Sequence, residues 1–179
     1  CNQAIEARLR GASPPPPKSV MAPGTQQALS EEEIQAREPV VLGVELEERK
    51  TSIEVFRRLG AGSVFYTLRA PLPLGLQITR VEKGDMRGSF LVESVVEGAS
   101  ERISQTVRPG DVLHALTTEV STMGVTTFDS GQMSRYQQLV DTSFLNSVEM
   151  LVEAMLTNSP GDDLVLLLER SAAAVRESE

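Results

Sequence analysis

The sequence predicts one α+β domain, preceded by a segment without a hydrophobic core of its own. Short apolar runs separated by turn residues fill residues 63–171 and are typical of strands. Within that region, residues 148–156 instead repeat apolar side chains every three or four positions, as an amphipathic helix does. Four consecutive prolines at 14–17 predict extended, polyproline-like chain before the domain. We therefore expect an arm over 1–62, the domain over 63–171 and a tail over 172–179.

The Pro-rich part of the arm has two interpretations, and the sequence leaves both open. It is either a flexible linker or a recognition segment laid along a neighbouring surface. After it, Ser30 and Glu33 have the spacing of a capping box. This spacing predicts a short helix from Ser30 to about Arg37, ended near Pro39.

A second short helix is expected from residue 51 or 52 to residue 59. Ile53, Phe56 and Leu59 recur at three-residue spacing and would form one narrow apolar stripe, and Gly60 would end the helix. Because so narrow a stripe cannot form a core alone, we expect both helices to pack on the domain or on a partner.

Five strands are expected in the domain, each a run of β-branched, aromatic or leucine residues between turn signals. They cover residues 64–69, 76–81, 89–95, 111–116 and 163–169. In the second of them, Leu76 and Ile78 face one side of the sheet and the polar residues face the other. Turns at 83–85 and 109–111, and a short helical turn near 98–102, separate these strands.

The region before the last strand contains a polar stretch and then the expected helix. Residues 117–146 are polar and give few structural signals, so we treat them as a long insert. Ser147 can cap the helix that follows. The apolar positions of that helix are Val148, Leu151, Val152, Met155 and Leu156. The chain after Arg170 is expected to fray.

The composition argues against several classes of function. The formal net charge is −8, which disfavours a nucleic-acid partner because phosphate binding needs clustered Lys and Arg. One cysteine and one histidine are too few for a disulfide framework or for a metal site built from several such ligands. There is no apolar run of roughly eighteen residues, so no membrane span is expected.

Catalysis and cofactor binding are not expected either. The sequence has no Gly-x-Ser-x-Gly motif, and the single histidine, His114, lies in an expected strand, where a structural role is the better interpretation. Gly60-Ala61-Gly62 lacks the Lys and the helix that follow a phosphate-binding loop. The acidic residues at 31–33 and 162–163 do not have the spacing of a Ca²⁺ loop. We therefore predict a non-catalytic protein without cofactor or metal.

Three stretches of the domain together carry a resemblance to a known family. They are Pro73-Leu74-Gly75-Leu76, Pro109-Gly110-Asp111-Val112-Leu113 and residues 148–158. They are similar, in this order, to the carboxylate-binding Gly-Leu-Gly-Phe loop, the Gly-Asp turn and the groove helix of PDZ domains. Residues 64–170 therefore resemble the PDZ family. The resemblance implies a small, partly open β-barrel or sandwich of five to six strands with two helices.

The resemblance also implies a groove that binds an extended peptide by its C-terminus. The N–H groups of Leu74, Gly75 and Leu76 would hold the terminal carboxylate, and the strand beginning at Leu76 would pair with the peptide. Arg69 would either support the carboxylate or lie solvated at the end of its strand. Val148 aligns with the first residue of the groove helix, so we expect an apolar ligand residue two positions before the terminus.

The pocket for the last side chain of the ligand would have two apolar walls. Leu74 and Leu76 would form one wall, and Val152 and Met155 would form the other. The full set of implied peptide-binding residues is Arg69, Leu74, Gly75, Leu76, Ile78, Val148, Val152 and Met155.

A narrower resemblance concerns the PDZ domains of chloroplast proteins. Residues 66–76 resemble their strand, proline and apolar-Gly-apolar triplet, and residues 110–118 resemble their Gly-Asp strand. The chain departs from these proteins by the insert at 117–146 and by lacking an evident tetratricopeptide array. The resemblance implies an accessory or assembly subunit that docks onto a thylakoid photosystem complex through its domain and arm, on the stromal side. The alternatives are a cytoplasmic PDZ scaffold for C-terminal peptides and a regulatory PDZ fragment of a protease.

Overall fold

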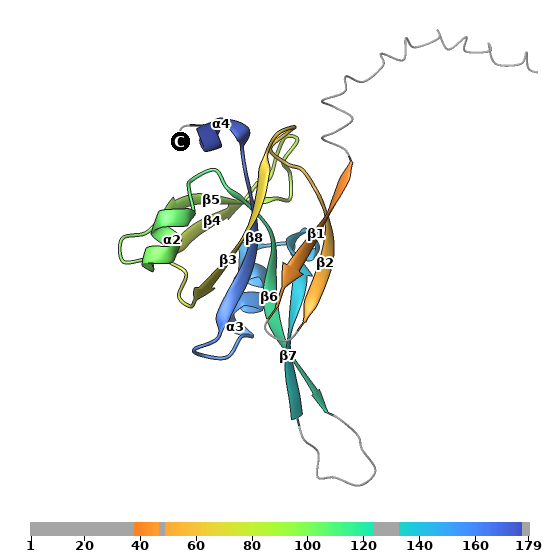
Figure 1. Cartoon of the computed structure of the whole chain (residues 1–179). Coiled ribbons are helices and arrows are strands. Elements are labelled where there is room, and N and C mark those ends of the chain that lie inside the picture. Colours follow the sequence, from red (N-terminus) through yellow and green to blue (C-terminus); the bar gives the residue numbers. More distant parts are fainter. Residues whose placement is uncertain (1–37, 47–48, 124–132, 177–179) are drawn as a thin grey trace, which may run out of the picture.

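The computed structural model describes residues 38–46, 49–123 and 133–176, which form two antiparallel β-sheets and a few short helices (Figure 1). The elements of this part are β1 (Pro39–Glu45), β2 (Lys50–Phe56), β3 (Val64–Pro71), β4 (Leu76–Arg80), β5 (Phe90–Val95), α2 (Glu101–Thr106), β6 (Val112–Met123), β7 (Met133–Asp141), η2 (Thr142–Phe144), α3 (Val148–Leu156), β8 (Asp163–Arg170) and α4 (Ala172–Arg176). Antiparallel sheets with a few short helices are compatible with the expected small α+β fold, and the sheets are not closed into a barrel.

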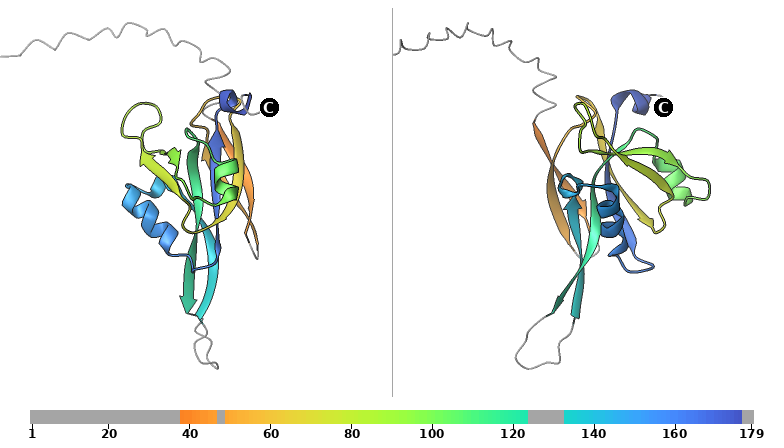
Figure 2. Two further views of the ribbon diagram at one scale, coloured as in Figure 1. Left: turned by 90° about the vertical axis from the view of Figure 1, so that its left-hand side faces the viewer. Right: turned by 180° about the vertical axis from the view of Figure 1, so that it is seen from behind.

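The larger sheet is built around β8. Its strand order is β3-β8-β6-β5-β4, and β7 pairs with β6. The apolar run Leu164–Leu168 of β8 is buried along its whole length, so both faces of this strand must be covered. Figure 2 shows how: α3 lies on one side of the sheet and the β1–β2 hairpin lies on the other.

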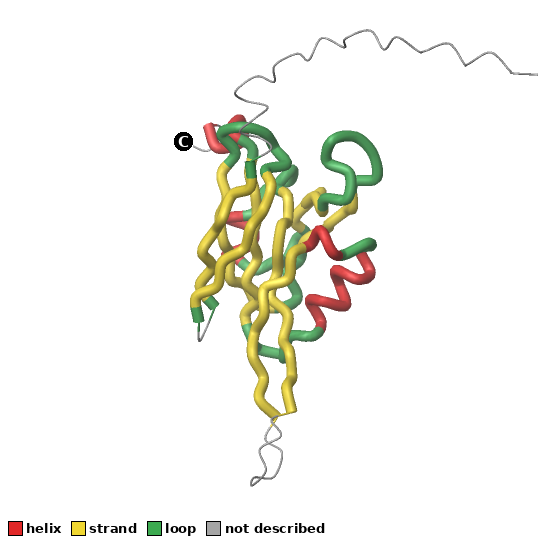
Figure 3. The backbone as a smooth tube through the Cα atoms, turned by 90° about the vertical axis from the view of Figure 1, so that its right-hand side faces the viewer, coloured by secondary structure: helices red, strands yellow, loops and turns green. Residues whose placement is uncertain are grey.

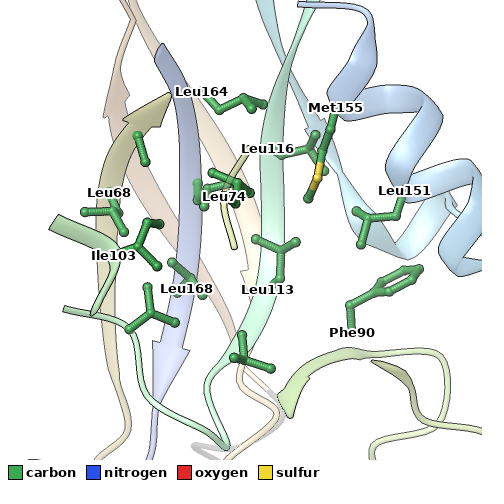
Figure 4. Close-up of a cluster of buried hydrophobic side chains, with 14 of the residues drawn as sticks. Leu68, Leu74, Phe90, Ile103, Leu113, Leu116, Leu151, Met155, Leu164 and Leu168 are labelled. Carbon is green, nitrogen blue, oxygen red and sulfur yellow. The ribbon is translucent and has the colours of Figure 1, made fainter. Parts of the chain in front are cut away.

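The larger hydrophobic core lies on the α3 side of this sheet. There, alternate residues of β8 meet Ile103 of α2 and the buried face of α3. Figure 4 shows Leu151 and Met155 directed from α3 toward Leu113 and Leu116 of β6. On the opposite face, the remaining residues of the β8 run pack against β1 and β2 in two smaller clusters.

Residues 51–59 do not form the expected helix. They contain β2, which pairs with β1 along its whole length. Ile53 packs toward the main sheet and Val55 is 2% exposed, whereas Phe56 is 48% exposed, so the apolar pattern has a period of two. Ile and Val favour strands over helices, and a second apolar run at 40–44 supplies the pairing partner that a hairpin needs.

The β1–β2 hairpin packs with the domain and does not stand apart in an arm. The segment after it is fixed by two hydrogen bonds, in which the N–H groups of Arg58 and Leu59 donate to the buried Glu169 carboxylate at 2.8 and 3.0 Å. The globular unit therefore includes residues from β1 onward. The prolines at 14–17 and the helix expected at 30–37 lie outside the described residues.

Much of the expected insert at 117–146 continues the main sheet. β6 runs on to Met123 and pairs with β7, and the two strands project as a long hairpin beyond the rest of the sheet (Figure 3). The apolar pattern that marks a strand is missing in this part of β6, because some buried positions are polar. Thr117 is one of them: it is buried, and its hydroxyl accepts a hydrogen bond from the N–H of Val165 at 2.9 Å. Residues 124–132 of the insert lie outside the part of the chain that the structure describes.

The chain also does not fray directly after Arg170. α4 begins two residues later, and the N–H of Val175 donates to the carbonyl of Ser171 at 3.2 Å. The remaining expected elements are present, with ends shifted by a few residues or less: β3, β4, β5, β8, and α3 with Ser147 as its N-cap.

Candidate functional site

The loop between β3 and β4 is held in one conformation by Gly75. This residue has φ +67°, in the left-handed region that glycine adopts without strain. A Cβ atom at this position would lie 2.7 Å from the Cβ of Ala99, so no larger residue fits. The carbonyl of Gly75 accepts a hydrogen bond from the N–H of Val96 at 2.9 Å. The loop is thereby pinned against the segment that enters α2.

This anchoring leaves several backbone donors of the loop without a protein partner. Among the described residues, neither the N–H of Leu74 nor that of Gly75 donates a hydrogen bond. The bond from Val96 to Gly75 makes Leu76 and Val95 a pair whose backbone groups point away from each other. The N–H of Leu76 therefore points away from β5, toward the open edge of the sheet, and has no partner in β5. Three successive N–H groups are available to an anion at this loop.

β4 provides an open strand edge directly after these donors. It is the last strand in the order of the main sheet, and no strand of the described residues pairs with its outer side. Because backbone groups alternate along a strand, Leu76, Ile78 and Arg80 all present their N–H and C=O groups to this open side. The hydrogen bond from Val81 to Ser89 agrees, since it places the backbone groups of Arg80 away from β5.

The two elements that border the open edge, β4 and α3, carry apolar side chains that are partly or largely exposed. Leu76 and Ile78 are partly buried against the core, and α3 lies next to β4. On α3, Val148 is partly buried, Val152 is 45% exposed and Leu156 is 69% exposed. These three residues follow each other at intervals of four, so they lie on one face of the helix. Sequence reasoning assigned Val148 and Val152 to the site and omitted Leu156, although Leu156 has the same spacing.

Leu74 and Met155, which were expected as pocket walls, have little exposed surface. Both side chains are buried in the core, and Figure 4 shows Met155 directed toward Leu116 of β6. The reason is the helical period: Met155 lies four residues after Leu151, on the face of α3 that covers the sheet. Leu74 still belongs to the site, but through its backbone N–H alone.

The structure does not bring Arg69 together with the loop donors. Its neighbours in β3, Leu68 and Ala70, point into the larger core, so Arg69 points to the opposite face of the sheet. There its guanidinium donates to the carbonyl of Glu45 on β1 at 2.7 Å. Arg69 thus ties β3 to the hairpin.

His114 belongs to a buried polar cluster on that same opposite face. Its Nε2 donates to the carboxylate of Glu169 at 2.7 Å, and Ser63 and two backbone N–H groups donate to the same carboxylate. Burial opposes the ionisation of Glu169, but these hydrogen bonds outweigh it and hold the pKa of that carboxyl below its usual value. The expected structural role of His114 fits this arrangement, in which Ser63 and His114 both face the carboxylate.

A second buried cluster joins β3, β6 and β8. Asp111 accepts hydrogen bonds from the hydroxyl of Tyr66 at 2.6 Å, from the N–H of Arg108 at 2.7 Å and from Arg170 at 2.7 and 2.9 Å. The hydrogen bond to Asp111 raises the pKa of Arg170. The pKa of Tyr66 is also raised, mainly because Tyr66 is buried and in addition because it is hydrogen-bonded to Asp111. Asp111 belongs to the Gly-Asp turn, so this turn stabilises the fold by linking β3 and β8 through hydrogen bonds.

Two further findings concern residues 38–46, 49–123 and 133–176. Within these ranges, no group of three or more His, Cys, Asp and Glu side chains is placed to hold a metal ion. Nor does that part contain a helix long and apolar enough to cross a membrane. The candidate site is the open edge of β4 with its loop donors, because among the described residues it combines an unpaired strand edge with unpaired N–H groups. No family model, curated protein or solved structure matches this chain.

Proposed function

We propose that this protein is a non-catalytic, PDZ-like module that binds the C-terminal segment of another protein along β4. The observation that carries the proposal is the row of free N–H groups at Leu74, Gly75 and Leu76, placed at the start of an open strand edge. A terminal carboxylate needs several converging donors, and an extended peptide needs a strand to pair with. This loop and this strand offer both in one continuous stretch of chain.

The position of α3 supports the same proposal. In the PDZ resemblance, the groove helix precedes the last strand, and here α3 precedes β8 and lies beside β4. A peptide on the edge of β4 would place alternate side chains between Leu76 and Ile78 on one side and Val152 on the other. Burying the exposed apolar surface of Val152 and Leu156 would add affinity at about 25 cal/mol per Å².

The binding mode follows from these contacts. The ligand pairs antiparallel to β4, with its carboxylate at the loop and its last residue opposite Leu76. Its third residue from the end lies opposite Ile78, and both side chains face the same side as their partners on β4. Apolar residues are favoured at both ligand positions, because Leu76 is apolar at the first and Ile78 and Val148 are apolar at the second.

The proposal is tested with a fluorescent octapeptide that has valine at its last and third-last positions. Titration with the whole chain should give saturable binding, and Val152→Glu should weaken it at least about tenfold, or about 1.4 kcal/mol. The matched control is Val41→Glu, on the exposed side of β1, which should leave binding unchanged. Gly75 is unsuitable as a test position because its Cβ would collide with Ala99 and disturb the fold.

Blocking the carboxylate gives a second arm of the same experiment. The same octapeptide with a C-terminal amide should bind at least about tenfold more weakly, since the loop donors lose their charged acceptor. Equal binding of acid and amide would reject terminal recognition. Absence of binding by all peptides would reject the proposed function.

The narrower chloroplast resemblance extends the proposal to a role as an accessory or assembly subunit at a thylakoid photosystem complex. It rests on residues 66–76 and 110–118. Purified photosystem complexes should then retain the wild-type chain in co-sedimentation and lose the Val152→Glu variant. Equal retention of both chains, or of neither, would favour a general scaffold or a protease-associated fragment.

A further inference from the structure

Arg80 lies at the C-terminal end of β4, and its side chain is on the same face of the strand as those of Leu76 and Ile78, which form the apolar wall of β4. Leu76, Ile78 and Arg80 alternate with residues that point the other way. Arg80 also pairs across the sheet with Phe90, whose side chain is fully buried in the larger core. The guanidinium of Arg80 thus lies at the edge of an apolar face, where a charged group is costly unless an anionic group pairs with it.

The partner that Arg80 has within the described residues is weak. One guanidinium nitrogen lies 3.2 Å from the carboxylate of Glu82, whose side chain is 71% exposed. The Arg80 side chain is itself only 22% exposed, and its Nε is buried with no hydrogen-bond partner among the described residues. An ion pair with so exposed a carboxylate contributes little, and it leaves most of the guanidinium donors unused.

The register of the proposed complex places one ligand residue opposite Arg80. If the last ligand residue lies opposite Leu76 and the third-last opposite Ile78, the fifth-last lies opposite Arg80. Directly opposed residues of an antiparallel pair share one face. The side chain of the fifth-last residue therefore points to the same side as the guanidinium.

We propose that Arg80 makes the site selective for ligands with an acidic residue at the fifth position from the C-terminus. This inference rests on the proposed function, because it uses the same strand edge. A ligand carboxylate can form a bidentate, charge-assisted pair with a guanidinium, which a neutral side chain cannot. The ligand class is thus a C-terminal segment with Asp or Glu fifth from the end and apolar residues third from the end and last.

The test compares two octapeptides that differ only in having glutamate or glutamine at the fifth-last position. Wild-type protein should bind the glutamate peptide about three- to tenfold more tightly, as expected for a partly exposed ion pair. This preference should shrink as salt is added. Arg80→Gln should bind both peptides with equal affinity and keep its affinity for the glutamine peptide.

A charge-matched control separates the contact from the net charge. Lys50→Gln removes one positive charge from the β1–β2 hairpin, where Lys50 is highly exposed, and should keep the wild-type preference. If wild-type protein binds both peptides equally, the role of Arg80 is wrong and the proposed function stands. If neither peptide binds, the proposed function itself fails. Thermal unfolding of Arg80→Gln checks that the variant is folded.

Discussion

At the scale of single residues, two buried carboxylates hold the sheet together. Glu169 and Asp111 are nearly inaccessible to water, and each accepts at least four hydrogen bonds. A buried charge is tolerated only when it is paired or fully hydrogen-bonded, so both clusters depend on all of their donors being in place. The clusters join segments far apart in the chain, and His114, the single histidine, serves one of them.

Replacing Glu169 with glutamine should lower the free energy of unfolding by about 2–3 kcal/mol at pH 7, because the charge-assisted hydrogen bonds are lost. The folded-state pKa of Glu169 is depressed, so its contribution is complete above the unfolded pKa and is lost as the pH falls through the folded value. Urea unfolding at pH 7 and in acid should show the gap between wild type and variant closing below about pH 4.3. Glu97→Gln, at an exposed position, is the control and should show no such gap.

At the scale of elements, β2 shows how one apolar pattern admits two interpretations. Ile53, Phe56 and Leu59 fit a helical stripe, while Ile53 and Val55 fit a strand. The strand forms because β1 pairs with β2 and because Val55 reaches Ala115 and Leu167 on the main sheet. Neither partner can be recognised from the local sequence of 51–59.

The two interpretations of β2 make opposite predictions for neighbouring substitutions. Val55→Ala should cost about 2 kcal/mol of unfolding free energy, since it leaves a cavity beneath the hairpin. Phe56→Ala should cost less than about 1 kcal/mol, because Phe56 is half exposed. Chemical denaturation of both variants measures the difference. A larger loss for Phe56→Ala would contradict the hairpin.

At the scale of the whole molecule, β8 contacts other elements with both of its faces, and on one of them it packs against the β1–β2 sheet. Leu164, Leu166 and Leu168 fill the core on the α3 side, and Val165 and Leu167 fill the clusters beneath the hairpin. Neither face of β8 can lose its cover without exposing a continuous apolar run. β8 therefore couples the hairpin to the remainder of the domain by packing.

This coupling predicts one cooperative unfolding transition for the domain. The two tyrosines report on different strands, Tyr66 on β3 and Tyr136 on β7. Urea transitions followed by tyrosine fluorescence and by far-ultraviolet circular dichroism should coincide. Separate midpoints would show that the hairpin or the β6–β7 extension unfolds independently.

Local sequence signals are enough to predict several elements of this fold. They locate β3, β4, β5, β8 and α3, the N-cap at Ser147 and the tight loop at Gly75, because turn residues, alternation and helical spacing act over a few positions. Leu76 and Ile78 lie on β4, and Val148 and Val152 lie on α3, which is next to β4, whereas their role in binding a peptide stays a prediction.

Other features of the fold depend on contacts between segments that are distant in the sequence, and local signals do not predict them. Residues 50–56 form the strand β2, and β6 continues through a polar stretch. The side chains of Leu74 and Met155 are buried in the core, and that of Arg69 lies on the opposite face of the sheet. Arg80 is also aligned with the apolar wall of β4. Each of these outcomes follows from which face another segment covers, and a single stretch of sequence does not specify the segment that will cover it.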